Sequence, residues 1–182
     1  MLIIYDFTPR ITIFTDNITT LESLLIYAMK TITYQSDYLG NGFEFATINQ
    51  PDDYEGKVVA TVIRKQCSMP SNKAVLYVHG FNDYFFQSDM AHRFNEKEYH
   101  FYAIDLRKYG RSTLPHQKSN NMRSLTEYFA DLDEALDIVR QEGNEQVLLS
   151  GHSTGGLLVT LYASERVGNE KFDTIFCNSP FY

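Results

Sequence analysis

The alternation of apolar and polar positions changes along this chain, and each change predicts an element. Apolar residues alternate with polar ones over Phe43–Ile48 and recur over Val58–Ile63, with a turn expected at Pro51–Asp53. This arrangement predicts a hairpin. Continuous apolar runs follow at Ala74–Val78 and Tyr99–Ile104. Short runs of this kind are typical of strands that are covered on both faces of a sheet.

Apolar residues spaced three or four positions apart predict helices between the strands. Phe86, Met90 and Phe94 predict a helix over Tyr84–Asn95. A second helix is predicted by six apolar residues on one face: Leu125, Tyr128, Phe129, Leu132, Leu136 and Val139. Residues 106–123 are polar and lie between the strand at Tyr99–Ile104 and this second helix. They are expected to form a loop.

The second helix is expected to begin at a capping box of Ser124 and Glu127 and to end at Gly143. Two more strands follow, at Val147–Leu149 and Phe172–Cys177, with a helix between them. From the third strand onward, strands and helices therefore alternate. This order predicts a three-layer α/β fold: a mostly parallel sheet with an N-terminal hairpin and helices on both faces.

Residues 39–182 contain all of these elements and are expected to form one core, whereas residues 1–38 are expected to be an N-terminal extension or arm. Residues 1–28 lack the strand and turn pattern seen later, and Met29 resembles a native start. The apolar N-terminus is interrupted by Asp6 and has no basic region before it, so it does not resemble a signal peptide.

Composition limits the classes of function. The net charge is −7 and no cluster of Lys and Arg occurs, which argues against a nucleic-acid partner. Cys67 and Cys177 have neither disulfide nor metal-binding spacing, so a reducing cytoplasm is expected and no metal or organic cofactor is implied. No apolar run approaches the roughly 18 residues of a membrane-spanning helix.

The strand before the last helix leads directly into a Gly-x-Ser-x-Gly pentapeptide around Ser153. A sharp turn between strand and helix exposes a hydroxyl, which makes Ser153 the candidate nucleophile. Gly151 and Gly155 leave room for the close approach of strand and helix, and Gly156 eases it further. The N–H of Thr154, at the start of the helix, is the expected first oxyanion donor.

His79 and Gly80 end an earlier central strand, and the C-terminal ends of parallel strands share one edge of a sheet. The N–H of Phe81 is therefore the expected second oxyanion donor. Gly80 permits close approach, and His79 is expected to shape the loop. Asp105 ends the next strand and is expected to hold the loop that follows by pairing with Arg111.

Other candidate side chains have structural interpretations. His152 is expected to pack in the core, because adjacent side chains on the turn point apart. Surface or helix positions are expected for the remaining three histidines, His92, His100 and His116, which have no metal-binding spacing. Cys177 is expected to be a buried strand residue. A nucleotide-binding loop is not expected, because Ser153 stands where the dinucleotide fingerprint requires glycine.

Four blocks together resemble the α/β-hydrolase superfamily, and most closely its branch of monoacylglycerol lipases, lysophospholipases and serine aminopeptidases. The blocks are Val75–Asp83, Asp105–Ser112, Gly151–Gly156 and Asn178–Phe181, and the resemblance covers about residues 39–182. It implies a partial α/β-hydrolase fold in which Ser153 is the nucleophile. The N–H groups of Phe81 and Thr154 would then form the oxyanion hole.

In this superfamily the catalytic Asp and His follow the nucleophile along the chain. After Ser153 this sequence has no histidine, and its one aspartate there, Asp173, begins a predicted strand. The chain is therefore expected to be the N-terminal part of a longer hydrolase, without the C-terminal strands and the cap.

The resemblance implies hydrolysis of carboxylic esters with acyl chains, such as monoacylglycerols or lysophospholipids, without a cofactor. Two alternatives stay open. One is an amide substrate, as in serine aminopeptidases. The other is a non-catalytic fragment or interaction module of the same fold, which would associate with itself through an exposed sheet edge.

Overall fold

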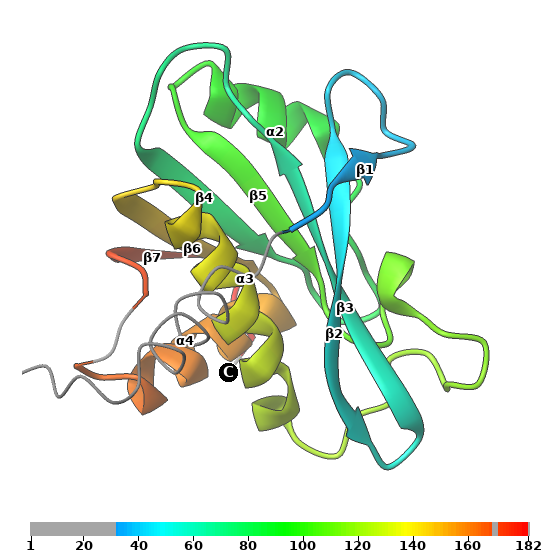
Figure 1. Ribbon diagram of the computed structural model, residues 1–182. Helices are drawn as coiled ribbons and strands as arrows, with labels where there is room; N and C mark the ends of the chain where they lie inside the picture. Colours follow the sequence, from blue (N-terminus) through cyan, green and yellow to red (C-terminus); the bar gives the residue numbers. More distant parts are fainter. Residues whose placement is uncertain (1–31, 169–170, 182) are drawn as a thin grey trace, which may run out of the picture. The chain divides into compact units, whose positions relative to one another are not determined.

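The computed structural model of this protein describes residues 32–168 and 171–181 (Figure 1). The strands are β1 (Gln35–Ser36), β2 (Glu44–Asp53), β3 (Gly56–Lys65), β4 (Lys73–Val78), β5 (His100–Asp105), β6 (Gln146–His152) and β7 (Thr174–Asn178). The helices are α2 (Ser88–Asn95), α3 (Phe129–Gln141) and α4 (Thr154–Glu165), with short 3₁₀ turns η1 (Gly110–Ser112) and η2 (Leu125–Tyr128). The hypothesis about residues 1–28 lies outside the described residues.

The strands form one sheet in the order β1-β2-β3-β5-β4-β6-β7. β2 and β3 pair antiparallel, and β3 pairs antiparallel with β5. β5, β4, β6 and β7 are parallel to one another. The predicted hairpin followed by a mostly parallel sheet is confirmed. β1 lies within the segment assigned to an N-terminal arm, and it pairs with β2.

Helices cover both faces of the sheet, as the alternation of elements predicts (Figure 1). α3 and α4 cover one face, where Leu132, Leu136 and Leu158 are fully buried against β4, β5 and β6. α2 covers the other face, where Ala91 packs with Phe101 on β5. β4 and β5 are therefore buried on both faces, which explains why their sequences do not alternate.

The predicted turn at Pro51–Asp53 is wrong, because β2 continues through these residues to Asp53. The register of β2 against β3 shifts between Gln50 and Asp53, and the hairpin turns at Tyr54 and Glu55. β1 pairs only with the start of β2. The missing N–H of Pro51 therefore falls on a part of β2 that no described strand pairs with on its outer side, which is where a strand tolerates proline.

Helix α2 begins four residues later than the apolar spacing predicts. Phe85 is completely buried, and its N–H donates to Asp105 Oδ1 over 2.8 Å. This bond pulls the chain before Ser88 toward the end of β5, which prevents a helical path. Here a contact between distant segments overrides the local repeat.

The predicted capping box is confirmed at η2. The Ser124 hydroxyl accepts from the N–H of Thr126, and Glu127 Oε1 accepts from the N–H of Ser124 over 3.2 Å. The first turn is 3₁₀, and α3 continues from Phe129. At the other end Gly143 has φ 88°, the left-handed conformation that terminates a helix.

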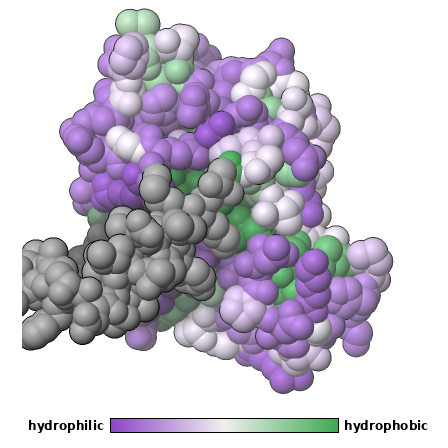
Figure 2. All heavy atoms as spheres, viewed as in Figure 1, coloured by the Kyte–Doolittle hydropathy of each residue, from purple (hydrophilic) through white to green (hydrophobic). Residues whose placement is uncertain are grey.

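On the side drawn in Figure 2, hydrophilic side chains cover most of the visible described surface, with smaller hydrophobic areas between them. Among residues 32–168 and 171–181, no helix has both the length and the apolar character needed to cross a bilayer.

Candidate active site

Ser153 stands alone between the end of β6 and the start of α4. Its backbone has φ 53° and ψ −120°, a conformation that non-glycine residues rarely adopt. Strain of this kind persists only where the surroundings enforce it, and it is concentrated at functional sites. The predicted strand-turn-helix arrangement around Ser153 is therefore present.

The strand and the helix meet so closely that two glycines are required. A Cβ on Gly151 would lie 2.4 Å from the carbonyl oxygen of Gly155. A Cβ on Gly155 would lie 2.4 Å from the carbonyl oxygen of His79. Gly156 is also confined, because its Cβ would come within 2.9 Å of Pro180. Backbone atoms cannot move aside as a flexible side chain can, so the turn depends on Gly151 and Gly155.

A brace from the last residue of β7 and from the segment after it also holds the turn. The carbonyl oxygen of Asn178 accepts from the N–H of Ser153 over 3.0 Å. The N–H of Phe181 donates to the carbonyl oxygen of Ser153 over 3.3 Å. The sequence identifies Asn178–Phe181 only as a block of resemblance, and its bracing role follows from the pairing of β7 with β6.

The loop after β4 lies directly against the serine turn. A Cβ on Gly80 would be 3.3 Å from Ser153 Cβ. His79 beside it is buried, and its Nδ1 lies 2.7 Å from the carbonyl oxygen of Gly80. Its Nε2 accepts from the N–H of Leu106 over 3.2 Å. His79 thus ties the loop to the end of β5.

The imidazole of His79 is unsuited to act as a base for Ser153. Burial lowers its pKa below the ordinary value, while the bond to the Gly80 carbonyl opposes that shift. The ring is therefore neutral, with its Nδ1 proton directed at Gly80 and its Nε2 lone pair occupied by Leu106. No ring nitrogen is left for the serine hydroxyl.

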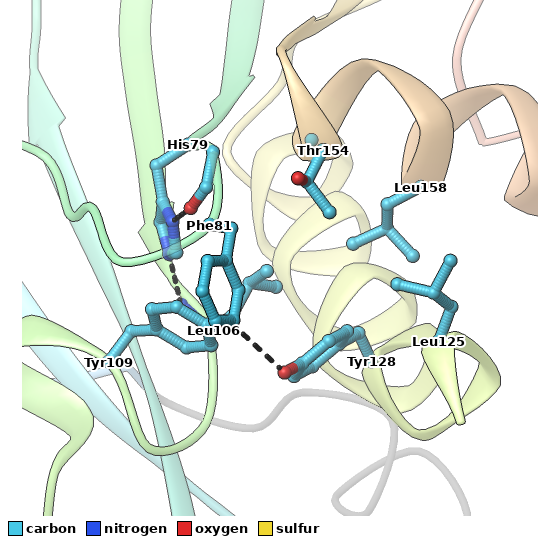
Figure 3. A pocket seen from close by; sticks show the side chains of 10 residues that line it. His79, Phe81, Leu106, Tyr109, Leu125, Tyr128, Thr154 and Leu158 are labelled. Atoms are coloured by element: carbon cyan, nitrogen blue, oxygen red, sulfur yellow. Dashed lines mark hydrogen bonds between the residues drawn. The ribbon is translucent and has the colours of Figure 1, made fainter. Parts of the chain in front are cut away.

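Phe81 and Thr154 both line one small hollow (Figure 3). Thr154 is the first residue of α4, where the N–H has no helical acceptor. Within the described residues, neither N–H donates a hydrogen bond. The two N–H groups therefore have the free donors that an oxyanion hole requires.

The hollow has mostly apolar walls and a volume of only about 10 Å³, roughly the space of one water molecule. It is lined by Phe81, Leu106, Tyr109, Leu125, Tyr128 and Leu158 among others (Figure 3). The Tyr128 hydroxyl lies 3.5 Å from the Tyr109 hydroxyl, and burial raises the pKa of Tyr109. Leu125, Tyr128 and Leu158 were predicted only as helix residues, because helical spacing does not reveal which of them border a cavity.

The expectation that His152 packs in the core is wrong. The side chain is half-exposed, and its Nδ1 lies 3.2 Å from the carbonyl oxygen of Asn178. His152 points to the same face of β6 as Leu148, because every second side chain of a strand lies on the same face and the two are four positions apart. α2 packs against β5 rather than β6, so no described helix covers this end of β6. Cys177 is likewise only half-buried, against the carbonyl oxygen of Gly156.

The other titratable residues do not complete a triad. His100 is bonded to Cys67 and Ser71, and His116 to the carbonyl oxygen of Lys57. Asp173 precedes β7 and accepts from the N–H of Val147 over 2.6 Å. Val147 is six residues before Ser153 on β6, about 20 Å away at strand rise. Among the described residues, no histidine forms a hydrogen bond with Ser153.

The predicted pairing of Asp105 with Arg111 is confirmed. Arg111 Nη1 donates to Asp105 Oδ2 over 2.8 Å, and Arg111 also pairs with Asp37 over 2.7 Å. Next to it Arg107 forms a buried, bidentate pair with Asp131 of α3. The loop after β5 is therefore fixed to three separate parts of the fold.

An open, mostly parallel sheet, with helices on both faces and a strained serine turn at the C-terminal end of a central strand, defines the α/β-hydrolase class. Within this class, residues 69–182 match the family described as serine aminopeptidase, S33. The match covers more than half of the chain, so the protein belongs to this family of α/β hydrolases.

Similar proteins agree with this assignment. Mouse epoxide hydrolase 4 is 34% identical over 90 residues, which cover 49% of this chain and 23% of that protein. A carboxyl esterase from Bacillus coagulans has a TM-score of 0.60 at 18% identity. The match covers 73% of this chain and 43% of the esterase. A monoglyceride lipase variant from Saccharomyces cerevisiae has a TM-score of 0.54 at 18% identity, covering 83% and 45%.

At these identities the solved structures share the fold alone. The chain spans less than half the length of each of these three proteins.

Proposed function

We propose that this chain carries the nucleophile and the oxyanion hole of a serine hydrolase that acts on carboxylic esters. One observation carries the proposal: Ser153 is held at φ 53° at the start of α4, and Gly80 lies against it. Gly80 belongs to the loop after β4 that contains Phe81, which we call the oxyanion loop. A serine on such a turn, close to two backbone N–H groups that have no other acceptor, is the arrangement that acyl transfer requires.

In the proposed reaction, Ser153 Oγ attacks the carbonyl carbon of the ester and loses its proton to a histidine. The carbonyl oxygen becomes an oxyanion, which accepts hydrogen bonds from the N–H groups of Phe81 and Thr154. Collapse expels the alcohol and leaves an acyl-serine, which water hydrolyses. The histidine and the aspartate that orients it are proposed to come from a further part of the hydrolase, since no histidine follows Ser153 here.

Esters with an apolar acyl group, such as monoacylglycerols or lysophospholipids, are the proposed substrates. The aromatic and aliphatic side chains beside Phe81 and Thr154 favour an apolar group next to the serine. The hollow between them, about 10 Å³, is too small to hold an acyl chain, so the proposal places that chain outside it. The yeast structure is a monoglyceride lipase with a substrate analogue. No resident cofactor is part of the proposal. A reducing cytoplasm remains the expected location, and Cys67 and Cys177 are both free thiols.

An amide substrate is the second candidate, and the family match favours it. The family is described as serine aminopeptidase. The same serine and the same N–H groups would serve amide hydrolysis, because the tetrahedral oxyanion is alike in both reactions.

Labelling with a fluorophosphonate probe tests the proposal. The probe reacts with an activated serine, so wild type should be labelled at Ser153, and Ser153→Ala should not. Ser164→Ala is the matched control, because this exposed serine lies on the same helix and bonds only to the Leu161 carbonyl. Without a histidine partner, labelling should be slower than in a complete triad by a factor on the order of 10⁴–10⁶, so the probe is used in large excess.

Equal labelling of wild type and Ser153→Ala would contradict the serine function. The chain would then be a non-catalytic member of the fold. Turnover of a p-nitrophenyl ester against a p-nitroanilide, measured on a version of the hydrolase that includes a histidine, separates the ester from the amide substrate.

A further inference from the structure

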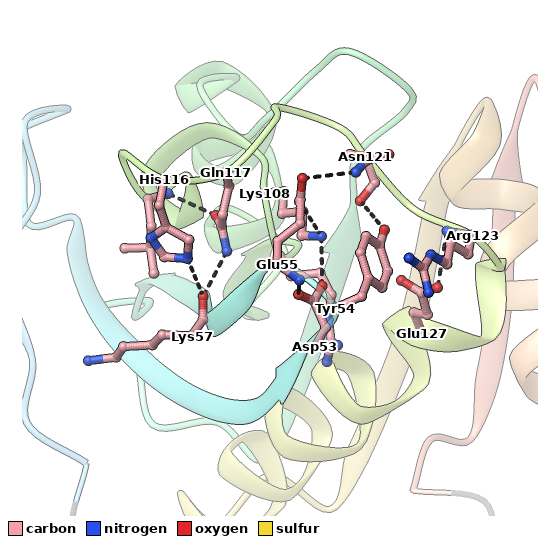
Figure 4. A network of polar contacts seen from close by, with 12 residues as sticks. Asp53, Tyr54, Glu55, Lys57, Lys108, His116, Gln117, Asn121, Arg123 and Glu127 are labelled. Carbon is pink, nitrogen blue, oxygen red and sulfur yellow. Dashed lines mark hydrogen bonds and ion pairs between the residues drawn. The ribbon is translucent and has the colours of Figure 1, made fainter.

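Lys108 is a buried cation that the proposed reaction does not use. Its side chain is 1% exposed, and its Nζ lies 2.6 Å from Asp53 Oδ2 and 2.7 Å from Glu55 Oε2 (Figure 4). The ammonium also lies 4.2 Å from the ring centroid of Tyr54. The tip of the β2–β3 hairpin therefore closes around one lysine. Removing the cation would leave two carboxylates facing each other.

The backbone of Lys108 has φ 65°, a left-handed conformation without glycine. This conformation lets three successive side chains point in three directions. Arg107 pairs with Asp131 on α3, Lys108 enters the hairpin tip, and Tyr109 lines the hollow beside the oxyanion loop. The ion pairs of Lys108 hold the backbone in a conformation that it would otherwise leave.

Two routes lead from Lys108 to the loop that carries the N–H of Phe81. In the first, the ring of Tyr109 packs 4.8 Å from the ring of His79, which is bonded to the carbonyl of Gly80. In the second, the Lys108 carbonyl accepts from the N–H of Asn120 over 3.0 Å.

Asn120 completes the second route. Its Nδ2 donates to Asn82 Oδ1 over 3.0 Å. Asn82 has φ 52°, so this bond supports a strained residue directly after Phe81. The oxyanion loop is therefore supported on both sides of Phe81, at Gly80 and at Asn82, by groups that Lys108 orients.

We propose that Lys108 is a positioning residue for the oxyanion hole: its ion pairs with Asp53 and Glu55 fix the loop after β5, and that loop fixes the N–H of Phe81. The inference rests on the proposed function, because an oriented Phe81 N–H matters only if an oxyanion forms beside Ser153. A misplacement of about 1 Å in such a donor lowers a rate by up to a hundredfold.

A purely structural role would have a different signature. If Lys108 only stabilised the fold, its replacement would lower the melting temperature and leave the folded oxyanion loop as ordered as before. The positioning role requires a local change at Phe81 and Asn82 while the distant strands stay unchanged.

The test combines Lys108→Met with a control, Lys171→Met. Lys171 pairs with Asp137 over 2.6 Å, far along the sequence from the oxyanion loop, so its loss also removes a lysine ion pair. The backbone ¹⁵N order parameters of Phe81, Asn82 and Leu149 are measured by NMR. In parallel, the rate of fluorophosphonate labelling is measured at a single probe concentration.

In Lys108→Met, the order parameters of Phe81 and Asn82 should fall from about 0.85 to below about 0.6, while that of Leu149 stays high. Labelling should slow by about ten- to a hundredfold. Lys171→Met should change neither quantity. If Lys108→Met does not fold, Glu55→Gln removes one of the two carboxylate charges and should produce a smaller change of the same kind.

Unchanged order parameters at Phe81 and Asn82 in a folded Lys108→Met or Glu55→Gln would overturn the positioning role. Failure of the proposed function is distinguishable, because it would be seen as absent labelling of Ser153 in the wild-type protein. The order parameters need no probe and no reaction.

Discussion

At the scale of single residues, the conformation of Ser153 depends on backbone atoms of its neighbours. Its strained backbone is enforced by the brace from Asn178 and Phe181 on one side and by the contact of Gly155 with β4 on the other. These contacts fix the backbone of Ser153 in its strained conformation.

Gly155→Ala should destabilise the fold by about 3 kcal/mol, because the new Cβ would overlap the carbonyl oxygens of Val78 and His79 at 2.5 and 2.4 Å. Urea unfolding followed by circular dichroism gives the free energy of unfolding. Gly143→Ala is the control: it has φ 88° but nothing within 4 Å of the new Cβ, so it should cost only about 1 kcal/mol. Equal losses in the two variants would contradict the steric argument.

The residue scale also shows the limits of sequence reasoning. The roles expected of Ser153 and its flanking glycines follow from a local motif, because a sharp turn needs small residues in fixed places. The exposure of His152 could not be predicted, because it depends on whether a helix distant in sequence covers the end of β6. Alternation along a strand indicates which side chains share a face, but not what covers that face.

At the scale of elements, the tip of the β2–β3 hairpin contacts residues 108–123, and Asn120 of that segment bonds to Asn82 in the loop after β4. Besides Lys108, the tip receives the Arg123 guanidinium 3.7 Å from the ring centroid of Tyr54 (Figure 4). Gln117 Nε2 donates to the carbonyl oxygen of Lys57 over 2.9 Å. The hairpin therefore acts as a support for residues 108–123.

The support is expected to depend on pH. Burial alone would raise the pKa of Asp53, but bonds from Lys108 and the Glu55 N–H lower it below the ordinary 3.8. The bond from Lys108 is the main cause that lowers the pKa of Glu55 below 4.5. A depressed folded pKa contributes stability that is present above the unfolded pKa and is lost as the pH falls through the folded value.

The pKa of Lys108 is affected in the opposite direction. Burial alone would lower it, but the bonds to Asp53 and Glu55 raise it above 10.5. Its contribution therefore persists until the pH rises through that raised value.

Wild type should exceed Lys108→Met in stability between about pH 5 and pH 10, and the difference should shrink below about pH 4. Urea unfolding of both proteins from pH 3 to pH 7 measures it. His79 is present in both proteins, so its titration cancels in the difference. A difference that stays constant down to pH 3 would show that the carboxylates of Asp53 and Glu55 do not hold the hairpin.

At the scale of the whole sheet, β7 pairs with β6 on one side, and no described strand lies on its other side. Alternate residues of β7 are exposed, including Phe176 at 56%. An apolar strand with free backbone groups is a template for pairing with another chain. This edge is the basis for the expected self-association.

Self-association should appear in sedimentation velocity as a sedimentation coefficient that increases with concentration in the micromolar range. Phe176→Lys should reduce it, because a charge on an edge strand opposes pairing with a second strand. Met69→Lys is the control, since Met69 is 59% exposed but lies in the loop between β3 and β4. A wild-type protein that stays monomeric throughout would contradict the prediction.

The sequence by itself determined the elements that depend on neighbouring residues. Apolar runs define β4, β5 and β6. A capping box and a glycine mark the two ends of the helical segment that contains α3, and the pentapeptide around Ser153 defines the turn. These features were predictable because hydrophobic periodicity and turn chemistry act over a few residues.

Only the tertiary structure decided the features that join distant segments. Among them are the continuation of β2 past Pro51, the late start of α2 and the brace from Asn178 onto Ser153. The enclosure of Lys108 by Asp53 and Glu55 belongs to the same group. Each depends on which strands lie side by side, because pairing brings together residues that are dozens of positions apart and carry no mutual signal in the sequence.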